Sequence, residues 1–166
     1  MKIRKILPVI LAVCMLTGCG NALKDGTKQL EEGNYKKAAE SQIPSYLTRI
    51  REKVGVAHHD MGFLYVPSCV AAYKLTGNKD AREAALLAAD NLVARYHEKG
   101  GFIQAWGPLD STEHYRFIID CLLNIPLLYW VAEVTRDETY QEIAYQHYQT
   151  TAANILRADG STYHTF

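Results

Sequence analysis

The sequence predicts an all-α fold built from helical hairpins, and three observations carry this prediction. Two segments, Val66–Tyr73 and Ile125–Val134, are apolar on nearly all sides, as is typical of helices that are buried all round. Each is followed by a segment with apolar residues at helical spacing and polar residues on its other face. No alternating run of useful length predicts a β-strand.

The first hairpin joins the helix at Val66–Tyr73 to an amphipathic helix that follows it. Gly77 predicts the end of the inner helix, because helices often end in a left-handed residue. Gly100 and Gly101 predict the end of the outer helix. The inward stripe of the outer helix consists of Ala81, Ala84, Ala85, Ala88, Leu92 and Tyr96. Its water-facing residues are Arg82, Glu83, Asp90 and Arg95.

The same layout returns after a shift of 59 residues. Pro67 then aligns with Pro126, and Thr76 aligns with Thr135. In the second copy, Asn124 and Pro126 predict a helix start, since proline is favoured at the first helical position. The second outer helix has Tyr140, Ile143, Ala144, His147 and Thr151 on one stripe. Such hairpins either stack into an open solenoid or close into an α/α barrel.

Composition excludes some classes of function. The formal net charge is +0, so there is no basic surface that would predict a nucleic-acid partner. The four cysteines, Cys14, Cys19, Cys69 and Cys121, match no zinc or disulfide framework. His58, His59 and Asp60 are adjacent, and adjacent residues rarely supply a full ligand set. We therefore expect neither a metal nor another cofactor.

The N-terminus has the pattern of a secretion signal. A basic start precedes an apolar run from Ile6 to Leu16, which is short for a membrane span. The run ends in Leu16-Thr17-Gly18-Cys19, which resembles the lipobox of bacterial lipoproteins. The resemblance implies cleavage before Cys19, acylation of Cys19, and an exported protein anchored to a membrane. We therefore expect a signal peptide at 1–18, a helical spacer at 19–43 and the main domain at 44–166.

The loops of the hairpins contain the candidate site residues. Asp60 and Asp120 each lie shortly before the proline of an inner helix, so both are expected at the same end of neighbouring helices. Helix axes lie roughly 8–10 Å apart, so the carboxylates can share one pocket. Trp106 and His164 follow the glycine turns and are expected on the same rim. Alternatively, Asp120 caps a helix dipole and Trp106 packs in the core.

Several motifs in fixed order resemble the unsaturated glucuronyl hydrolases, glycoside hydrolase family 88, which have an (α/α)6 barrel. The motifs are His58-His59-Asp60-Met61-Gly62-Phe63, Gly101-Phe102-Ile103-Gln104-Ala105-Trp106, Arg116-Phe117-Ile118-Ile119-Asp120-Cys121, Asn124-Ile125-Pro126-Leu127-Leu128-Tyr129-Trp130 and Asp159-Gly160-Ser161-Thr162-Tyr163-His164-Thr165-Phe166. The likeness extends roughly from Tyr46 to Phe166. It predicts a partial (α/α)6 barrel of helical hairpins, about half of a full one, and so a truncated hydrolase.

The resemblance also implies a reaction. The family removes the Δ4,5-unsaturated uronic acid that polysaccharide lyases leave at the non-reducing end of oligosaccharides, by adding water across the C4=C5 bond. By motif, Asp120 is the general acid and base and Asp60 is the second essential carboxylate. Trp106, His59 and His164 would bind the substrate. A carboxyl group in apolar surroundings beside a second carboxylate has a raised pKa, which suits an acid.

Two other functions remain open from the sequence. One is a non-catalytic helical module that binds an acidic oligosaccharide or a partner protein. The other is a related hydrolase that acts on unsaturated galacturonyl–rhamnose. Three further histidines, His97, His114 and His147, are interpreted as surface or flanking residues.

Overall fold

The computed structural model describes residues 20–166, with side chains from residue 24 onward. The predicted signal peptide at 1–18 and the candidate acylation site Cys19 lie outside the described residues. The described chain is mostly helical and forms two compact units, residues 20–52 with Leu64–Leu87, and Lys53–Phe63 with Ala88–Phe166. Among the helices described, none combines the length and the apolar character needed to cross a membrane.

The first unit is entirely helical. Its elements are α2 (Gly20–Glu31), α3 (Tyr35–Glu40), α4 (Ile43–Arg51), η1 (Val66–Val70), α6 (Ala71–Thr76) and the first part of α7 (Lys79–Val93). α3 packs against α2 and α6. The predicted inner helix begins earlier than Val66, as α5 (Met61–Tyr65), and passes through a π-helical turn at η1. Pro67 lies in that turn, and it lacks the N–H that a regular α-helical ladder needs.

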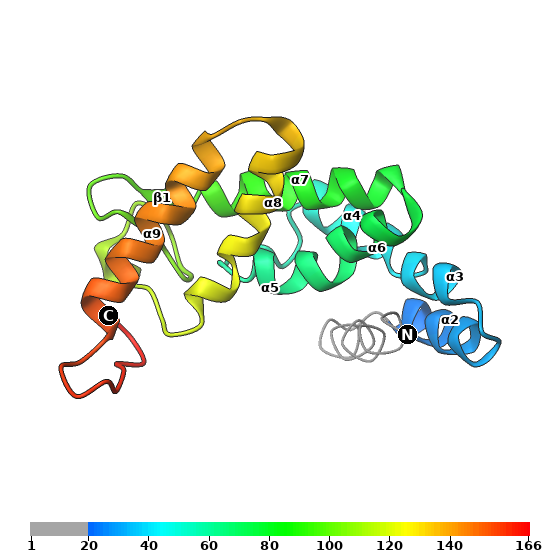
Figure 1. Cartoon of the computed structure of the whole chain (residues 1–166), viewed down its shortest axis with the longest axis horizontal. Coiled ribbons are helices and arrows are strands. Elements are labelled where there is room, and N and C mark those ends of the chain that lie inside the picture. The colour runs from blue at the N-terminus through cyan, green and yellow to red at the C-terminus, as the bar shows by residue number, and fades with distance from the viewer. Residues whose placement is uncertain (1–19) are drawn as a thin grey trace. The chain divides into compact units, whose positions relative to one another are not determined.

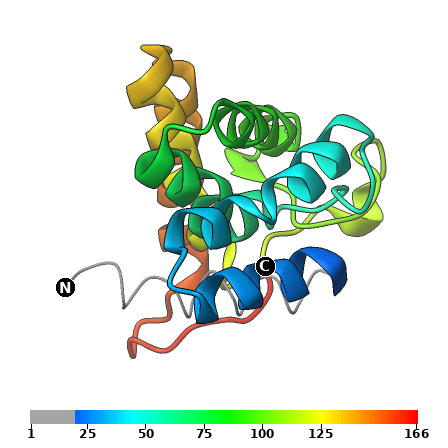
Figure 2. The ribbon, with the colours of Figure 1, turned by 90° about the vertical axis from the view of Figure 1, so that its right-hand side faces the viewer.

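The second unit contains the second hairpin. Its elements are the end of α7, β1 (Tyr96–His97), β2 (Phe102–Ile103), η2 (Thr112–His114), η3 (Cys121–Leu123), α8 (Ile125–Thr135) and α9 (Thr139–Ile155). α8 and α9 pack side by side, as both views show (Figure 1 and Figure 2). A buried cluster of Phe102, Phe117, Cys121 and Ile155 joins β2, η3 and α9. Pro126 lies in the first turn of α8, as predicted.

The 59-residue repeat is confirmed in local detail at the ends of the two inner helices. The hydroxyl group of Thr76 donates to Ala72 O at 2.8 Å, and that of Thr135 donates to Val131 O at 2.7 Å. The next residue is left-handed in both copies, Gly77 with φ 74° and Arg136 with φ 65°. The two hairpins therefore end their inner helices in the same way, although only the first uses glycine there.

The expected end of the first outer helix is wrong. The sequence placed it at Gly100 and Gly101, whereas α7 ends at Val93. The chain then forms an antiparallel pair in which Tyr96 faces Ile103 and His97 faces Phe102. Gly101, with φ 66°, lies in the turn of this hairpin. Strands of two residues are too short to give an alternating pattern, so the sequence showed no strand here.

Two polar residues that the sequence placed at the surface are buried. Arg95 was assigned to the water-facing side, but it lies beyond the last residue of α7 and is 6% exposed. His147 was placed on the stripe of the second outer helix and also interpreted as a surface or flanking residue. The second interpretation is wrong, because His147 is 1% exposed on α9 and its Nδ1 accepts a hydrogen bond from Ile103 N–H at 3.2 Å. Helical periodicity does not reveal such partners, because the backbone groups that satisfy them come from other elements.

Gly62 allows α5 and η3 to touch. A Cβ atom at Gly62 would overlap the backbone of Asn124, far inside the 3.0 Å that real Cβ atoms keep. The two segments are also joined by a hydrogen bond from Phe63 N–H to Asn124 Oδ1 at 2.9 Å. Asp60 lies just before α5 and Asp120 lies just before η3. This backbone contact therefore sets the separation of the two carboxylates.

We predict that Gly62→Ala destabilises the protein by about 3 kcal/mol, because the atom that the new methyl group meets belongs to the backbone and cannot rotate away. Urea unfolding of the full chain measures this as a lower transition midpoint at unchanged slope. Gly26→Ala is the control, since its methyl group meets the rotatable hydroxyl of Ser41 first. Equal midpoints for the two variants would contradict the assigned contact.

The two helix ends give a second prediction. A non-glycine residue in the left-handed region is strained by roughly 1–2 kcal/mol, whereas glycine adds about 0.4–1 kcal/mol of unfolded-chain entropy. Arg136→Gly is therefore expected to raise stability by about 0.5–1 kcal/mol. Gly77→Ala should lower stability by about 1 kcal/mol, although nothing lies within 4 Å of the new methyl group. Thermal unfolding measures both, and a loss of stability in Arg136→Gly would refute the strain argument.

Candidate functional site

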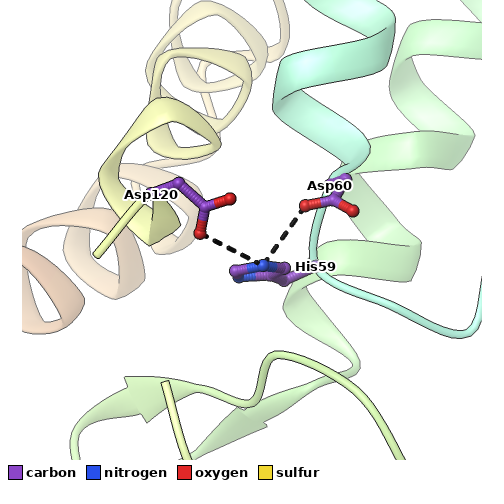
Figure 3. Close-up of side chains that lie close together, drawn as sticks. All are labelled: His59, Asp60 and Asp120. Carbon is purple, nitrogen blue, oxygen red and sulfur yellow. Dashed lines mark ion pairs between the residues drawn. The ribbon is translucent and has the colours of Figure 1, made fainter. Parts of the chain in front are cut away.

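Three of the predicted site residues converge in the second unit. Figure 3 shows the His59 ring between the carboxylates of Asp60 and Asp120. His59 Nε2 lies 3.2 Å from Asp60 Oδ1 and 3.6 Å from Asp120 Oδ1. One polar atom from each residue lies within 4.8 Å of the other two. The expectation that both carboxylates share one rim, within roughly 10 Å, is therefore confirmed.

Backbone contacts hold the histidine and its neighbour in place. His59 N–H donates to Ala105 O at 2.8 Å, which ties the loop before α5 to the segment after β2. Nδ1 of His58 accepts a hydrogen bond from Asp60 N–H at 3.2 Å, and Nε2 of the same ring lies 3.0 Å from Gly55 O. The turn before α5 is therefore fixed by hydrogen bonds, and Asp60 extends from this turn.

The local environment lowers the pKa of His59 and that of Asp60. Burial lowers the pKa of His59, although the charges of Asp60 and Asp120 act in the opposite direction. Hydrogen bonding to His58 is the main reason why the pKa of Asp60 is lowered, and the charge of His59 adds to it. Asp60 is thus held as a carboxylate, and His59 is held neutral at physiological pH.

Asp120 is more open than the sequence suggested. Its neighbours in the chain are apolar, but its side chain is 46% exposed. Asp120 occupies the N-cap position of the short helix η3, as the dipole alternative expects, but its side chain makes no capping hydrogen bond. Its Oδ1 atom is buried without a hydrogen-bond partner. The carboxylate of Asp120 therefore faces His59, 3.6 Å away, and also lines the small cavity beside it.

A small cavity lies beside the carboxylates. It measures about 130 Å³ and is lined by Asp60, Phe63, Asp120, Leu123 and Asn124. Pockets for small molecules usually measure roughly 300–1,000 Å³. The cavity is therefore large enough for part of a ligand, and the rest of a sugar would extend beyond these five residues.

Trp106 is not a core residue, which excludes the packing alternative. Its side chain is 37% exposed, and the guanidinium group of Arg116 lies 5.7 Å from the centre of its ring. Its backbone pairs with His58 in an isolated antiparallel bridge. An exposed indole ring next to the His58–Asp60 loop is suited to stacking on a sugar.

Two buried polar residues that the sequence did not identify shape the Trp106 loop. The Gln104 side chain donates to Trp106 O at 2.7 Å and to Pro108 O at 3.0 Å. Arg95 donates to Gln104 O at 2.8 Å and to Gly107 O at 3.1 Å. A buried cation that binds backbone carbonyls fixes a loop without using a carboxylate. The motif around Gln104 was the one signal that could have revealed this.

His164 is close to Asp120 through the backbone only. Its carbonyl oxygen accepts a hydrogen bond from Ile119 N–H at 2.9 Å. Its ring is exposed, and Nδ1 lies 3.0 Å from Thr165 Oγ1. Within residues 20–166, no hydrogen bond or ion pair joins the His164 ring to Asp60, Asp120 or His59. The structure therefore places His164 near the site but leaves its side chain turned to solvent.

The number of ligand atoms alone would permit a cation at this site. His59, Asp60 and Asp120 each offer one suitable atom. However, the nitrogen of His59 that faces the carboxylates is the one best placed to carry a proton, and a protonated nitrogen cannot bind a metal. With a proton on Nε2, the three residues therefore offer a cation the two carboxylates only.

Comparisons with known proteins found relatives both in sequence and in structure. No family model matches the sequence. Over 136 residues the chain is 52% identical to the unsaturated chondroitin disaccharide hydrolase of Streptococcus pneumoniae, and the match covers 82% of this chain and 34% of that protein. A crystal structure of unsaturated glucuronyl hydrolase from Streptococcus agalactiae superposes with a TM-score of 0.78 at 51% identity, covering 81% of this chain and 34% of that one.

A further solved structure contains a ligand. It is an Asp-to-Asn variant of the Streptococcus agalactiae enzyme in complex with dGlcA-GalNAc6S, with a TM-score of 0.66 at 37% identity, covering 84% of this chain and 32% of that one. The chain spans about a third of the length of these relatives, less than the half barrel expected from the sequence. The helical fold and the predicted resemblance are confirmed. Over about four fifths of its length the chain is similar to the unsaturated glucuronyl hydrolases, and it corresponds to a part of their (α/α)6 barrel.

Proposed function

We propose that the protein removes a Δ4,5-unsaturated glucuronic acid from the non-reducing end of oligosaccharides released by polysaccharide lyases. Water adds across the C4=C5 bond, and the product opens to release the neighbouring sugar. Asp120 is the general acid and base, and Asp60 is the second carboxylate. The observation that carries this proposal is the pair of carboxylates meeting at one histidine beside a small cavity.

The geometry does not favour direct attack at the anomeric carbon by an inverting mechanism. Inverting glycosidases separate their two carboxyl groups by roughly 6.5–9.5 Å to leave room for a water molecule. Here one carboxylate oxygen of Asp60 lies within 4.8 Å of one carboxylate oxygen of Asp120. They also converge on His59 instead of flanking a bond (Figure 3). Retaining glycosidases place their carboxyl groups roughly 5–5.5 Å apart, so the distance argues against the inverting geometry alone, and hydration of the double bond is proposed from the names of the relatives.

The names of the relatives indicate the substrate class. The Streptococcus pneumoniae relative is named for unsaturated chondroitin disaccharide, and the Streptococcus agalactiae variant holds dGlcA-GalNAc6S. We therefore propose an unsaturated chondroitin-type disaccharide as the substrate. The exposed indole ring of Trp106 would stack on the sugar.

The conjugated double bond of the substrate absorbs ultraviolet light, so its loss reports turnover directly. Because the chain spans a third of its relatives, the assay uses a chimera in which this chain replaces the matching segment of the Streptococcus agalactiae enzyme. The chimera is expected to bleach the disaccharide. Asp120→Asn should lower the rate by about 10²–10⁴-fold, which is the usual contribution of a general acid.

Asp110→Asn is the matched control, because Asp110 is exposed and has no ion pair or side-chain hydrogen bond in the described structure. Its rate should equal that of the parent chimera. If the chimera folds and binds the disaccharide without bleaching it, the protein is a binding module. If Asp120→Asn bleaches as fast as Asp110→Asn, Asp120 is not the acid.

We also propose that the protein is exported and acylated on Cys19, from the lipobox Leu16-Thr17-Gly18-Cys19. Two acyl chains or more would anchor it stably to a membrane, where one would not. Metabolic labelling with a fatty acid should label the wild type. Cys19→Ser should lose the label and accumulate as a larger precursor, whereas Cys14→Ser should keep both label and size. Unlabelled wild-type protein in the soluble fraction would refute the proposal.

A further inference from the structure

The two ring nitrogens of His59 have different surroundings. Nε2 faces Asp60 Oδ1 at 3.2 Å and Asp120 Oδ1 at 3.6 Å (Figure 3). Nδ1 is buried and has no hydrogen-bond partner. Ionised carboxylate oxygens only accept hydrogen bonds. An unprotonated Nε2 is an acceptor as well, so its lone pair would be repelled by both carboxylate oxygens. In the neutral ring the single proton therefore belongs on Nε2, between the carboxylates.

The surroundings of the ring keep it neutral. Its side chain is 3% exposed, and burial is the main cause of its lowered pKa. Asp60 and Asp120 favour the charged ring, and His58 and Arg95 oppose it. His147, whose pKa burial lowers to about 4, lies near enough to interact with His59. Desolvation thus outweighs the two carboxylates, and the ring offers one N–H rather than a positive charge.

The two oxygens of Asp120 are not equivalent. Oδ1 is fully buried on the His59 side, yet the side chain as a whole is 46% exposed. The accessible part of the carboxyl group must therefore lie on the side of Oδ2. Asp120 also lines the small cavity, which His59 does not line. A ligand in the cavity would meet Asp120 directly, with His59 behind it.

We propose that His59, in its Nε2–H form, is a positioning residue whose N–H faces Oδ1 of Asp60 at 3.2 Å and Oδ1 of Asp120 at 3.6 Å, and that Oδ2 of Asp120 is the oxygen that carries the catalytic proton. This inference rests on the proposed function. In the reaction the proton passes from Oδ2 of Asp120 to C4 of the sugar, the oxygen of a water molecule forms the new bond to C5, and the proton that this water loses returns to Asp120. His59 keeps its own proton throughout. His59 is thereby assigned to support the acid from behind instead of contacting the substrate.

The test is nuclear magnetic resonance of the histidine rings in the full chain labelled with ¹⁵N, without substrate. The His59 signals are identified by their loss in His59→Gln. We expect a protonated Nε2 and a bare Nδ1, retained below the ordinary histidine pKa of about 6.5. Asp120→Asn and Asp60→Asn should each lower the pKa of His59 further, because each removes a negative charge that favours the protonated ring. Asp110→Asn should leave it unchanged.

Three results would overturn the inference. These are a proton on Nδ1, a charged ring at neutral pH, and the same His59 pKa in Asp120→Asn as in Asp110→Asn. Should Asp120→Asn fail to fold, the tautomer in the wild type decides alone. Because no turnover enters this measurement, its outcome is independent of whether the chimera bleaches the disaccharide. A structural role for His59 alone would fix the ring but would not link its pKa to Asp120.

Discussion

The candidate site depends on one close contact between two backbones, at Gly62 and Asn124. No side chain can stand between them, and a hydrogen bond from Phe63 N–H to the Asn124 side chain joins the same two segments. The two carboxylates lie two residues before Gly62 and four residues before Asn124. Like charges at this separation repel, so the fold must hold them together by contacts made elsewhere. The backbone contact supplies that constraint.

Around this contact, buried polar groups are paired with backbone atoms more often than with opposite charges. Arg95 binds two carbonyl groups, and Gln104 binds the carbonyl groups of the Trp106 loop. Removing one partner of a buried hydrogen bond is more costly than the bond itself is stabilising. Loops fixed in this way have few alternatives at low energy. The Trp106 loop can therefore present an exposed indole ring without being mobile itself.

Much of the fold could be predicted because the repeat contains proline and glycine at helix ends, where these residues have strong conformational preferences. Pro126 marks a helix start and Gly77 marks a helix end, and both lie where the sequence predicted them. The β-hairpin could not be predicted, since Gly100 and Gly101 suit a helix end and a turn equally well. The burial of Arg95 and the hydrogen-bond partner of His147 also escaped prediction, because both depend on carbonyl and amide groups that come from other elements.

The site divides in the same way. The approach of Asp60 and Asp120 follows from the 59-residue register, whereas the buried His59 ring between them depends on a turn that no periodicity describes. All three residues belong to one compact unit, so the charged pair and its histidine are assembled by local contacts. The cavity of about 130 Å³ beside them is well below the roughly 300–1,000 Å³ of usual ligand pockets. Acid–base chemistry and sugar recognition therefore have different requirements: the first needs these few contacts, and the second needs walls beyond the five residues that line the cavity.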